Sequence, residues 1–378
     1  MKHLFFIAGL SLFVFTSFGP QPLKTEKLEL SFHKNIELIG LAYFIEFEGV
    51  DIENKTIEAD GKTIPKKEWH RYGYKIYQEY QAFASSENLA KSFSVADHLW
   101  LDYINALLLQ TEEVPNAKLT PKIKESYYIN FSKNKDLEEA KKNVQIFLNG
   151  LNAFSKEINF DAYISNSKVY YDRALQEIEN SLPEGNFINT MESFYQKKFD
   201  SYALIPSLTT PKGMGFGIRI TDNNQTTVFN VFGATDVQDL SDTSNLQMGF
   251  ANEEKLQELS VHEFGHSFVN PVVAQLPDSL FKQTEHLFIP IKPQMKAQGY
   301  NSWKVCVYEH FVRAGEVVIS EKMGNKAHAQ KLLTDYTEYR AFKYLPEIIS
   351  ELKKFEQGDY KTFEETVQKT MEMLSNKT

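Results

Sequence analysis

Apolar residues recur every three or four positions along most of the chain, which is the spacing of an amphipathic helix. The clearest stripe follows Asp136 and its neighbouring acids, which suit a helix N-terminus, and continues to Phe154. This periodicity predicts helices over residues 69–84, 89–109, 136–158 and 162–181. It predicts further helices over residues 253–269, 302–323, 327–344 and 345–355. Periodicity does not decide between a helix and a strand for residues 36–47, and we favour a helix over 36–44.

The pattern changes after residue 200. Residues 202–208, 215–220 and 227–232 are short runs rich in β-branched and aromatic side chains, and a polar turn separates the last two. We therefore predict an α+β fold that is mainly helical, in which a small antiparallel sheet precedes the helix over 253–269. That helix is expected to end where Asn270 meets Pro271, because proline disfavours a helical residue before it. Residues 20–200 are predicted to form a mostly helical N-terminal region and residues 201–378 a second region.

Composition narrows the possible partners and the compartment. The chain has 41 basic and 50 acidic residues, and this net charge of -9 disfavours binding to nucleic acid. Its only cysteine, Cys306, excludes an intrachain disulfide. Lys2 and His3 precede an apolar run over 4–15 that is too short to span a bilayer, and small residues follow it. We predict a signal peptide over 1–19 and a secreted or periplasmic protein without stable membrane insertion.

Residues 262–266 read His-Glu-Phe-Gly-His. On a helix, a spacing of four puts both imidazoles on one face, where they can reach one tetrahedral zinc ion at about 2.0 to 2.1 Å. Glu263 lies about 100° away around the helix, so it is placed beside the ion. A carboxylate there can act as a general base towards a water whose pKa zinc lowers to about 7. We predict that His262 and His266 bind one zinc ion per chain and that Glu263 is catalytic.

A catalytic zinc site of this kind needs a third protein ligand. Val269 and Val272 stand where a metzincin would have Gly and His, so that pattern is excluded. A glutamate on a later helix is another common solution, and we predict Glu309, with Arg313 on the same helical face holding its carboxylate. The alternatives are a surface ion-pair ladder on that helix, or one of four rival ligands: Glu316, His310, His286 and Glu285.

At these residues the chain resembles a gluzincin, the zincin group with an HExxH helix and a glutamate from a following helix. Residues 261–271 and 309–314, together with Tyr336, Arg340, Tyr344 and the Asn-Ile-Glu-Leu-Ile-Gly run at 35–40, are similar to a bacterial family of exported proteins catalogued as domain of unknown function 4932. The resemblance implies a zincin-like core over 201–378 and a metallopeptidase activity. It implies no particular substrate.

The zincin resemblance also implies two features around the metal. One strand of the hairpin, 215–220 or 227–232, would pair with an extended peptide substrate, although it could instead only cover the core. Tyr336, Arg340 or Tyr344 would stand near the oxyanion that develops during hydrolysis, although the two tyrosines could instead pack in the core.

These observations predict an exported, zinc-dependent peptidase that acts on a peptide or protein substrate. Two alternatives remain open from the sequence: a secreted protein that binds a peptide or an envelope component on a zincin scaffold without cleaving it, and a structural role for His262 and His266 in a core. The specificity, the choice between endo- and exopeptidase action, and the oligomeric state have no signal in the sequence.

Overall fold

The core of the fold is a five-stranded sheet in the order β1-β2-β5-β7-β6. The computed structural model describes residues 23–24, 27–59, 62–182 and 187–377, so the predicted signal peptide lies outside the described residues. The strands are β1 (Leu23–Lys24), β2 (Leu28–Leu30), β5 (Ser201–Pro206), β6 (Gly215–Asp222) and β7 (Gln225–Phe232). A separate hairpin consists of β3 (Thr56–Ala59) and β4 (Lys62–Pro65).

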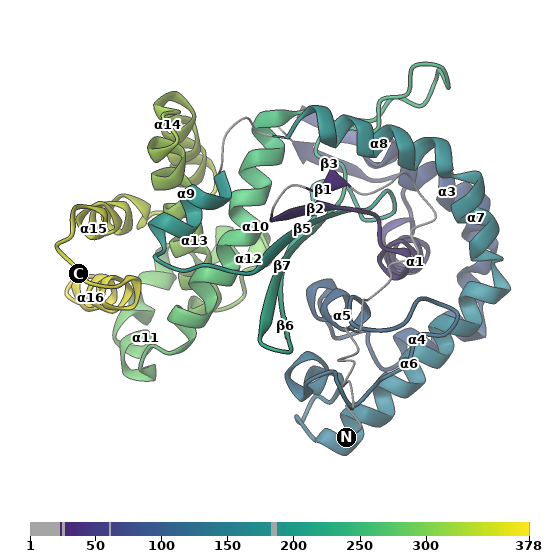
Figure 1. Cartoon of the computed structure of the whole chain (residues 1–378), viewed down its shortest axis with the longest axis horizontal. Helices are drawn as coiled ribbons and strands as arrows, with labels where there is room; N and C mark the ends of the chain where they lie inside the picture. The colour runs from purple at the N-terminus through teal and green to yellow at the C-terminus, as the bar shows by residue number, and fades with distance from the viewer. Residues whose placement is uncertain (1–22, 25–26, 60–61, 183–186, 378) are drawn as a thin grey trace, which may run out of the picture.

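The prediction of an antiparallel sheet was wrong, because the sheet is mixed. β6 and β7 form the predicted antiparallel hairpin, but β7 lies beside β5 and runs parallel to it. β2 also pairs with β5 in parallel, with Leu28 opposite Tyr202. The hairpin therefore docks on β5 through its second strand, which leaves β6 as an edge strand of the sheet (Figure 1).

The hairpin turn decides which groups of β6 face outwards. Asn223 and Asn224 have φ of 47° and 63°, which is the left-handed pair of a two-residue type I′ turn. Asp222 and Gln225, which flank such a turn, form a hydrogen-bonded pair, and hydrogen bonding to β7 then recurs at every second residue of β6. The N–H and C=O groups of the intervening residues, from Gly215 to Thr221, point away from the sheet.

Helices cover the sheet on both sides (Figure 1). The first half contains α1 (Lys34–Tyr43), η1 (Phe44–Glu48), α2 (Lys66–Trp69), α3 (Arg71–Tyr80), η2 (Gln81–Ser85), α4 (Glu87–Phe93), α5 (Leu101–Leu108), η3 (Glu125–Tyr127), η4 (Ile129–Phe131), α6 (Leu137–Glu157), α7 (Phe160–Asn166), α8 (Lys168–Asn180) and α9 (Phe187–Phe194). The second half contains α10 (Glu253–Ala274), α11 (Asp278–Thr284), η5 (Glu285–Ile291), α12 (Lys292–Ala297), α13 (Trp303–Lys322), α14 (Lys326–Thr334), η6 (Asp335–Tyr339), α15 (Leu345–Gln357) and α16 (Phe363–Ser375).

Several predicted helices are interrupted. The one over 69–84 breaks at His70, whose φ of -111° and ψ of 54° are not helical. The one over 89–109 is two helices, because the chain turns between Phe93 and Trp100. The one over 162–181 divides at Ser167, and the one over 327–344 ends in the wider turn η6 before Ala341, whose φ is 60°. Periodic burial continues across these breaks, so the pattern alone does not reveal them.

The helix α10 is longer than predicted, because it continues through Pro271 to Ala274. Proline removes the N–H that would bond the carbonyl of Ser267, four residues earlier. The guanidinium of Arg219 on β6 donates to that carbonyl at 3.3 Å instead. This hydrogen bond satisfies the carbonyl that Pro271 leaves without a helical partner, and it links α10 to the edge strand β6.

Two buried polar residues of α1 connect the first half of the chain to the sheet. Asn35 donates to the carbonyl of Leu108 at 3.2 Å and accepts from the N–H of Val114 at 2.8 Å. Glu37 accepts from the N–H of Leu208, just after β5, at 3.0 Å. The motif at 35–40 therefore has a structural role at the junction between α1 and the sheet.

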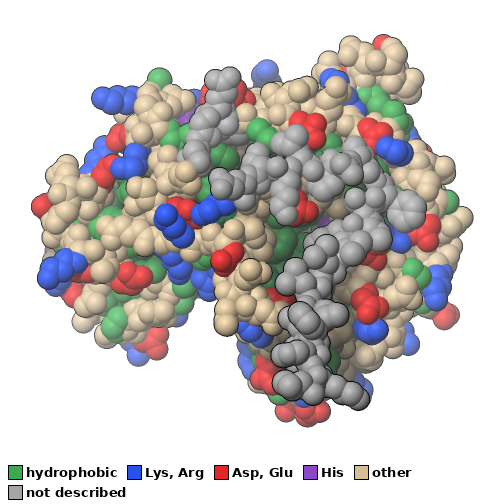
Figure 2. Space-filling model, viewed as in Figure 1, with side chains coloured by type: hydrophobic (Ala, Val, Ile, Leu, Met, Phe, Trp, Pro, Cys, Tyr) green, Lys and Arg blue, Asp and Glu red, His purple; other side chains and the backbone are tan. Residues whose placement is uncertain are grey.

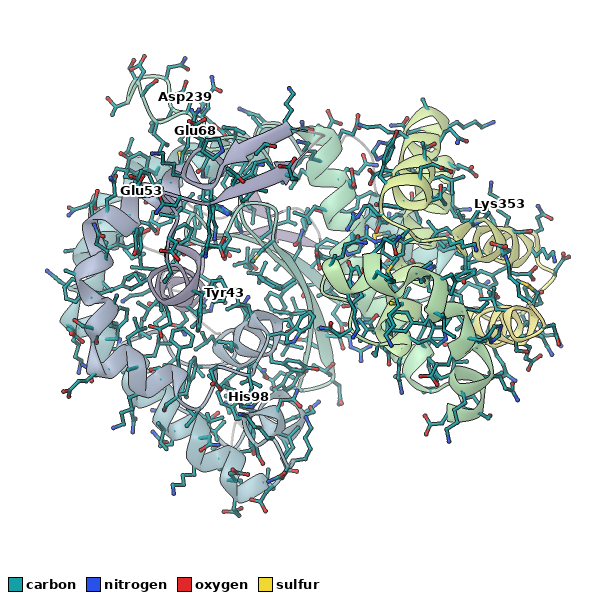
Figure 3. The ribbon with its side chains drawn as sticks, turned by 180° about the vertical axis from the view of Figure 1, so that it is seen from behind. Tyr43, Glu53, Glu68, His98, Asp239 and Lys353 are labelled. Atoms are coloured by element: carbon teal, nitrogen blue, oxygen red, sulfur yellow. The ribbon has the colours of Figure 1, made fainter. Side chains whose placement is uncertain are left out.

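The loop between β7 and α10 projects from the molecule at Asp239, on the side opposite the C-terminal helices that Lys353 marks (Figure 3). In the part of the chain that the structure describes, no helix is long and apolar enough to cross a bilayer.

Candidate metal centre

Two long helices place the predicted ligands. The helix α10 begins after Asn252, whose side chain accepts from the N–H of Lys255 at 3.0 Å, and it carries His262 and His266 on successive turns. The helix α13 begins after Ser302, whose hydroxyl caps the N–H of Val305, and it carries Glu309. The two helices pack together, and each presents its ligands to the other.

The three ligand groups meet at spacings that suit a tetrahedral ion. The Nε2 atoms of His262 and His266 are 3.3 Å apart. One carboxylate oxygen of Glu309 is 3.4 Å from Nε2 of His266, and the other is 3.8 Å from Nε2 of His262. Two ligands about 2.0 to 2.1 Å from a tetrahedral zinc ion are themselves about 3.3 Å apart. The three groups thus fit around one ion without rearrangement.

The other nitrogen of each imidazole identifies its tautomer. Nδ1 of His262 lies against a carboxylate oxygen of Glu316, and Nδ1 of His266 is 3.2 Å from the amide oxygen of Asn270. Both partners are acceptors, so both Nδ1 atoms carry the proton. Burial and the charge of Arg313 hold the pKa of His262 well below its ordinary value, so this ring is neutral. Two Nε2 lone pairs therefore face each other and a carboxylate, an arrangement that a cation would stabilise.

Two neighbouring side chains fix the position of the Glu309 carboxylate. The hydroxyl of Tyr300 donates to one of its oxygens at 3.2 Å, and the guanidinium of Arg313 lies 3.4 Å from the same oxygen. The other oxygen faces His266. Burial raises the pKa of Glu309, but the interactions of its carboxylate with the rings of His266 and His262 and with Arg313 outweigh this effect, and the pKa lies below its ordinary value. Glu309 is therefore ionised at neutral pH, as a metal ligand must be.

Glu316 is excluded as a ligand to the same ion, because it lies against Nδ1 of His262 on the far side of the ring. The hydroxyl of Tyr336 donates to its second oxygen. Such a carboxylate fixes both the tautomer and the orientation of a ligating histidine. Tyr336 is fully buried and its hydroxyl is used in this contact, so it is not placed to stabilise an oxyanion.

Glu263 stands beside the three ligands, not among them. Its side chain is 5% exposed, and this burial raises the pKa of the carboxyl to about 7. The edge strand β6 passes very close to it: a Cβ on Gly215 would lie 2.6 Å from its carboxylate, and one on Gly217 would lie 2.0 Å from its backbone oxygen. Glycine at both positions lets the outer edge of the sheet run directly along the catalytic candidate.

The remaining candidates lie outside the ligand group. His310 donates to the carbonyl of Cys306 among buried aromatic rings, and His286 contacts the carbonyls of Gln283 and Lys377. Glu285 is exposed, and the hydroxyl of Tyr344 donates to the carbonyl of Leu287. These positions serve local packing.

Arg340 is half-buried near the centre. Its Nε donates to Gln298 at 3.3 Å, and its guanidinium lies over the rings of Tyr336 and Phe342. Its charge contributes to lowering the pKa of His262. In the described part of the chain, Arg340 has no carboxylate within ion-pair distance.

Two residues of the centre were not predicted. Asn270 is four residues after His266 on the same helix, so helical spacing could have identified it. Tyr300 precedes α13 in a loop, and no periodic pattern marks it.

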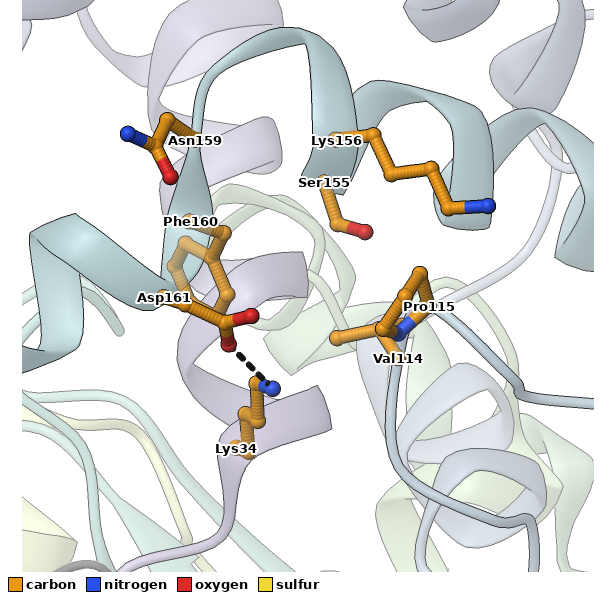
Figure 4. Close-up of a pocket in the computed structure, with 8 residues that line it drawn as sticks. All are labelled: Lys34, Val114, Pro115, Ser155, Lys156, Asn159, Phe160 and Asp161. Atoms are coloured by element: carbon orange, nitrogen blue, oxygen red, sulfur yellow. Dashed lines mark ion pairs between the residues drawn. The ribbon is translucent and has the colours of Figure 1, made fainter.

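Acidic and basic side chains are interspersed over the face shown in Figure 2. A small surface pocket between α1, α6 and α7 is lined by Lys34 and Asp161, which form an ion pair, and by none of the metal-centre residues (Figure 4).

Comparison with known proteins gives one match. A family model described as "Domain of unknown function (DUF4932)" matches residues 29–369. No curated protein and no solved structure matches the chain significantly.

Proposed function

We propose that this chain, which belongs to the DUF4932 family, is a zinc-dependent peptidase. His262, His266 and Glu309 would bind its zinc ion. One observation carries the proposal: two imidazole lone pairs and a carboxylate converge from two helices, with a second, uncoordinated carboxylate beside them. A structural core would have no reason to aim three electron-rich groups at one point, because their mutual repulsion is costly without a cation.

The choice of zinc follows from the donors. Two imidazole nitrogens and one carboxylate oxygen are a common catalytic zinc set, and three protein ligands leave one position for water or substrate. The side chains of His262 and His266 are 14% and 15% exposed, so neither imidazole is completely sealed from solvent. A bound zinc ion would polarise the scissile carbonyl and lower the pKa of a water.

Glu263 is the proposed general base. It takes a proton from the attacking water as the water oxygen bonds to the carbonyl carbon, and it returns the proton to the leaving nitrogen as the C–N bond breaks. A carboxyl whose pKa is about 7 is well matched to both transfers near neutral pH. Its close contact with β6 holds the carboxylate in one position.

The edge strand β6 is the proposed binding site for the substrate backbone. The outward N–H and C=O groups at Gly215 and Gly217 lie next to Glu263, where an extended peptide can pair with them. Arg340 is the candidate donor to the developing oxyanion, since the hydroxyls of Tyr336 and Tyr344 bond elsewhere.

The test is metal content combined with activity. Purified protein is expected to contain one zinc per chain and to cleave members of a peptide library. Glu263→Gln should retain zinc and lose at least a hundredfold in kcat, whereas His266→Gln should lose both. A protein without stoichiometric zinc, or a Glu263→Gln variant with full activity, would refute the proposal.

The same variants separate a peptidase from a binding protein on the same scaffold. A non-catalytic protein would bind zinc but cleave no peptide in the library, and Glu263→Ala would leave its affinity for a bound peptide unchanged. The position of Glu263 beside the three ligand groups and against the edge strand β6 favours the catalytic role.

A further inference from the structure

The free edge of β6 is closed at one end. The hydroxyl of Tyr127 donates to the outward carbonyl of Arg219 at 2.9 Å and accepts from the outward N–H of Thr221 at 3.4 Å. The outward groups of Gly215 and Gly217 have no such cover from the described residues. A peptide paired with β6 can therefore extend past the metal in one direction, while in the other it meets Tyr127.

The closed end lies on the His266 side of the metal centre. Gly215 and Gly217 contact Glu263, and Arg219 reaches the carbonyl of Ser267, so β6 and α10 run in the same direction. The helix α5 packs on β6 and also contacts η3, the short helix that carries Tyr127. Trp100, which precedes α5, comes within 4.0 Å of the position that a Cβ on Gly299 would occupy, so the N-terminal end of α5 reaches across to the loop before α13.

The helix α5 carries a carboxylate in its first turn. Asp102 is half-buried in the first turn of α5, and one of its oxygens accepts from the N–H of Tyr103 at 2.8 Å. Among the residues that the structure describes, it has no ion-pair partner. Burial raises the pKa of Asp102, and the hydrogen bond from the N–H of Tyr103 acts in the opposite direction.

Charge and strand direction both indicate which end of a peptide substrate would lie at the Tyr127 end of β6. Antiparallel pairing is the commoner and more stable arrangement, and it would put the amino-terminal side of a peptide at the Tyr127 end of β6. Parallel pairing would bring a terminal carboxylate towards Asp102, which would repel it. A terminal ammonium would instead gain a charge-assisted hydrogen bond.

On the basis of the proposed peptidase function, we propose that the enzyme is an aminopeptidase in its mode of action: it removes residues from the free amino terminus of peptides, and Asp102 binds the substrate ammonium.

The test compares peptides that differ only at the amino terminus. The zinc-loaded full-length protein is expected to hydrolyse free peptides with a kcat/KM at least tenfold above that of their N-acetylated forms. Asp102→Asn should reduce this preference about tenfold or more, mainly through KM, because it removes the charge from the contact. Asp97→Asn, which changes an exposed carboxylate just before α5, is the matched control and should leave the preference unchanged.

A binding measurement keeps the test independent of turnover. Leucine hydroxamate should bind zinc-loaded Glu263→Gln protein at least tenfold more tightly than N-acetyl-leucine hydroxamate, and Asp102→Asn should remove most of the difference. Equal cleavage or equal binding of the free and acetylated forms would overturn the aminopeptidase inference. If cleavage still depended on zinc and Glu263, the peptidase proposal would stand without the aminopeptidase inference. Absence of zinc from the protein would overturn both proposals.

Discussion

A single carboxylate behind His262 sets the direction in which that ring presents its lone pair. Glu316 is 2% exposed and contacts both Nδ1 of His262 and the hydroxyl of Tyr336. We expect Glu316→Gln to weaken zinc binding about 10- to 100-fold, because the neutral amide holds the imidazole less firmly and makes it less basic. Competition with a chromophoric chelator measures the effect.

The control for this experiment lies on the same helix. Glu321 forms an ion pair with Lys353 at the surface, away from the ligands, so Glu321→Gln should bind zinc like the unchanged protein. An unchanged zinc affinity in Glu316→Gln would show that His262 is oriented by the packing of α10 alone.

A second buried carboxyl predicts how stability depends on pH. Burial raises the pKa of Glu37 to about 7, although the hydroxyl of Tyr171 and the N–H of Leu208 donate to it and lower its pKa. Between pH 4.5 and 7 the folded chain holds a proton that the unfolded chain has lost, so this residue's contribution to stability falls as pH rises through that window. The total change is about 3 kcal/mol.

The measurement is urea unfolding of the unchanged protein and of Glu37→Gln across this range. The free energy of unfolding of the unchanged protein, relative to the variant, should decrease by about 3 kcal/mol as pH rises. Parallel pH profiles would show that Glu37 stays ionised in the fold.

At the scale of elements, substitutions at two glycines of β6 distinguish the contribution of its contact with α10 to stability from the effect of that contact on Glu263. An added Cβ at Gly217 meets the backbone of α10, which cannot yield locally, so Gly217→Ala should lower the free energy of unfolding by about 1 to 3 kcal/mol. At Gly215 the nearest atom belongs to the side chain of Glu263, so Gly215→Ala should leave stability nearly unchanged and reduce kcat by displacing the carboxylate. Thermal unfolding and peptidase assays distinguish the two outcomes, and equal stability losses would contradict this division.

Elements were predictable from the sequence where their signal is local. The helix that carries His262 and His266 and the hairpin of β6 and β7 combine periodicity with end signals within about twenty residues. The mixed sheet was not predictable, because side-chain alternation in β5 shows which face is buried but not which strand lies beside it. The break at His70 depends on one residue's backbone angles, which hydrophobic spacing does not encode.

The residues of the metal centre also fall into two groups: those that local spacing predicts and those that only tertiary structure brings together. A spacing of four residues is enough to pair His262 with His266, and the proximity of Glu309 follows from the packing of α10 on α13. Tyr300 comes to the centre from a loop, so only tertiary structure reveals it.

At the scale of the whole molecule, the zinc ion would be a cross-link between α10 and α13. Binding to the folded state alone adds about 2.7 kcal/mol at a free zinc concentration one hundred times Kd. We expect chelation to lower Tm by a few degrees, and we expect His266→Gln, which lacks one ligand, to show no further decrease with chelator. Differential scanning calorimetry measures both, and a Tm that chelation does not change would contradict the cross-link.

The parallel pairing of β2 with β5 has a consequence for any attempt to dissect the protein. Leu28 and Tyr202 are neighbours in the sheet although most of the first half of the chain separates them. A fragment that starts at Ser201 would lose β2 and α1, and would expose the apolar flank of β5 together with the unmet N–H of Leu208. Such fragments should aggregate when produced alone and regain solubility when co-expressed with residues 20–200, so the two halves are better treated as one cooperative unit than as separable modules.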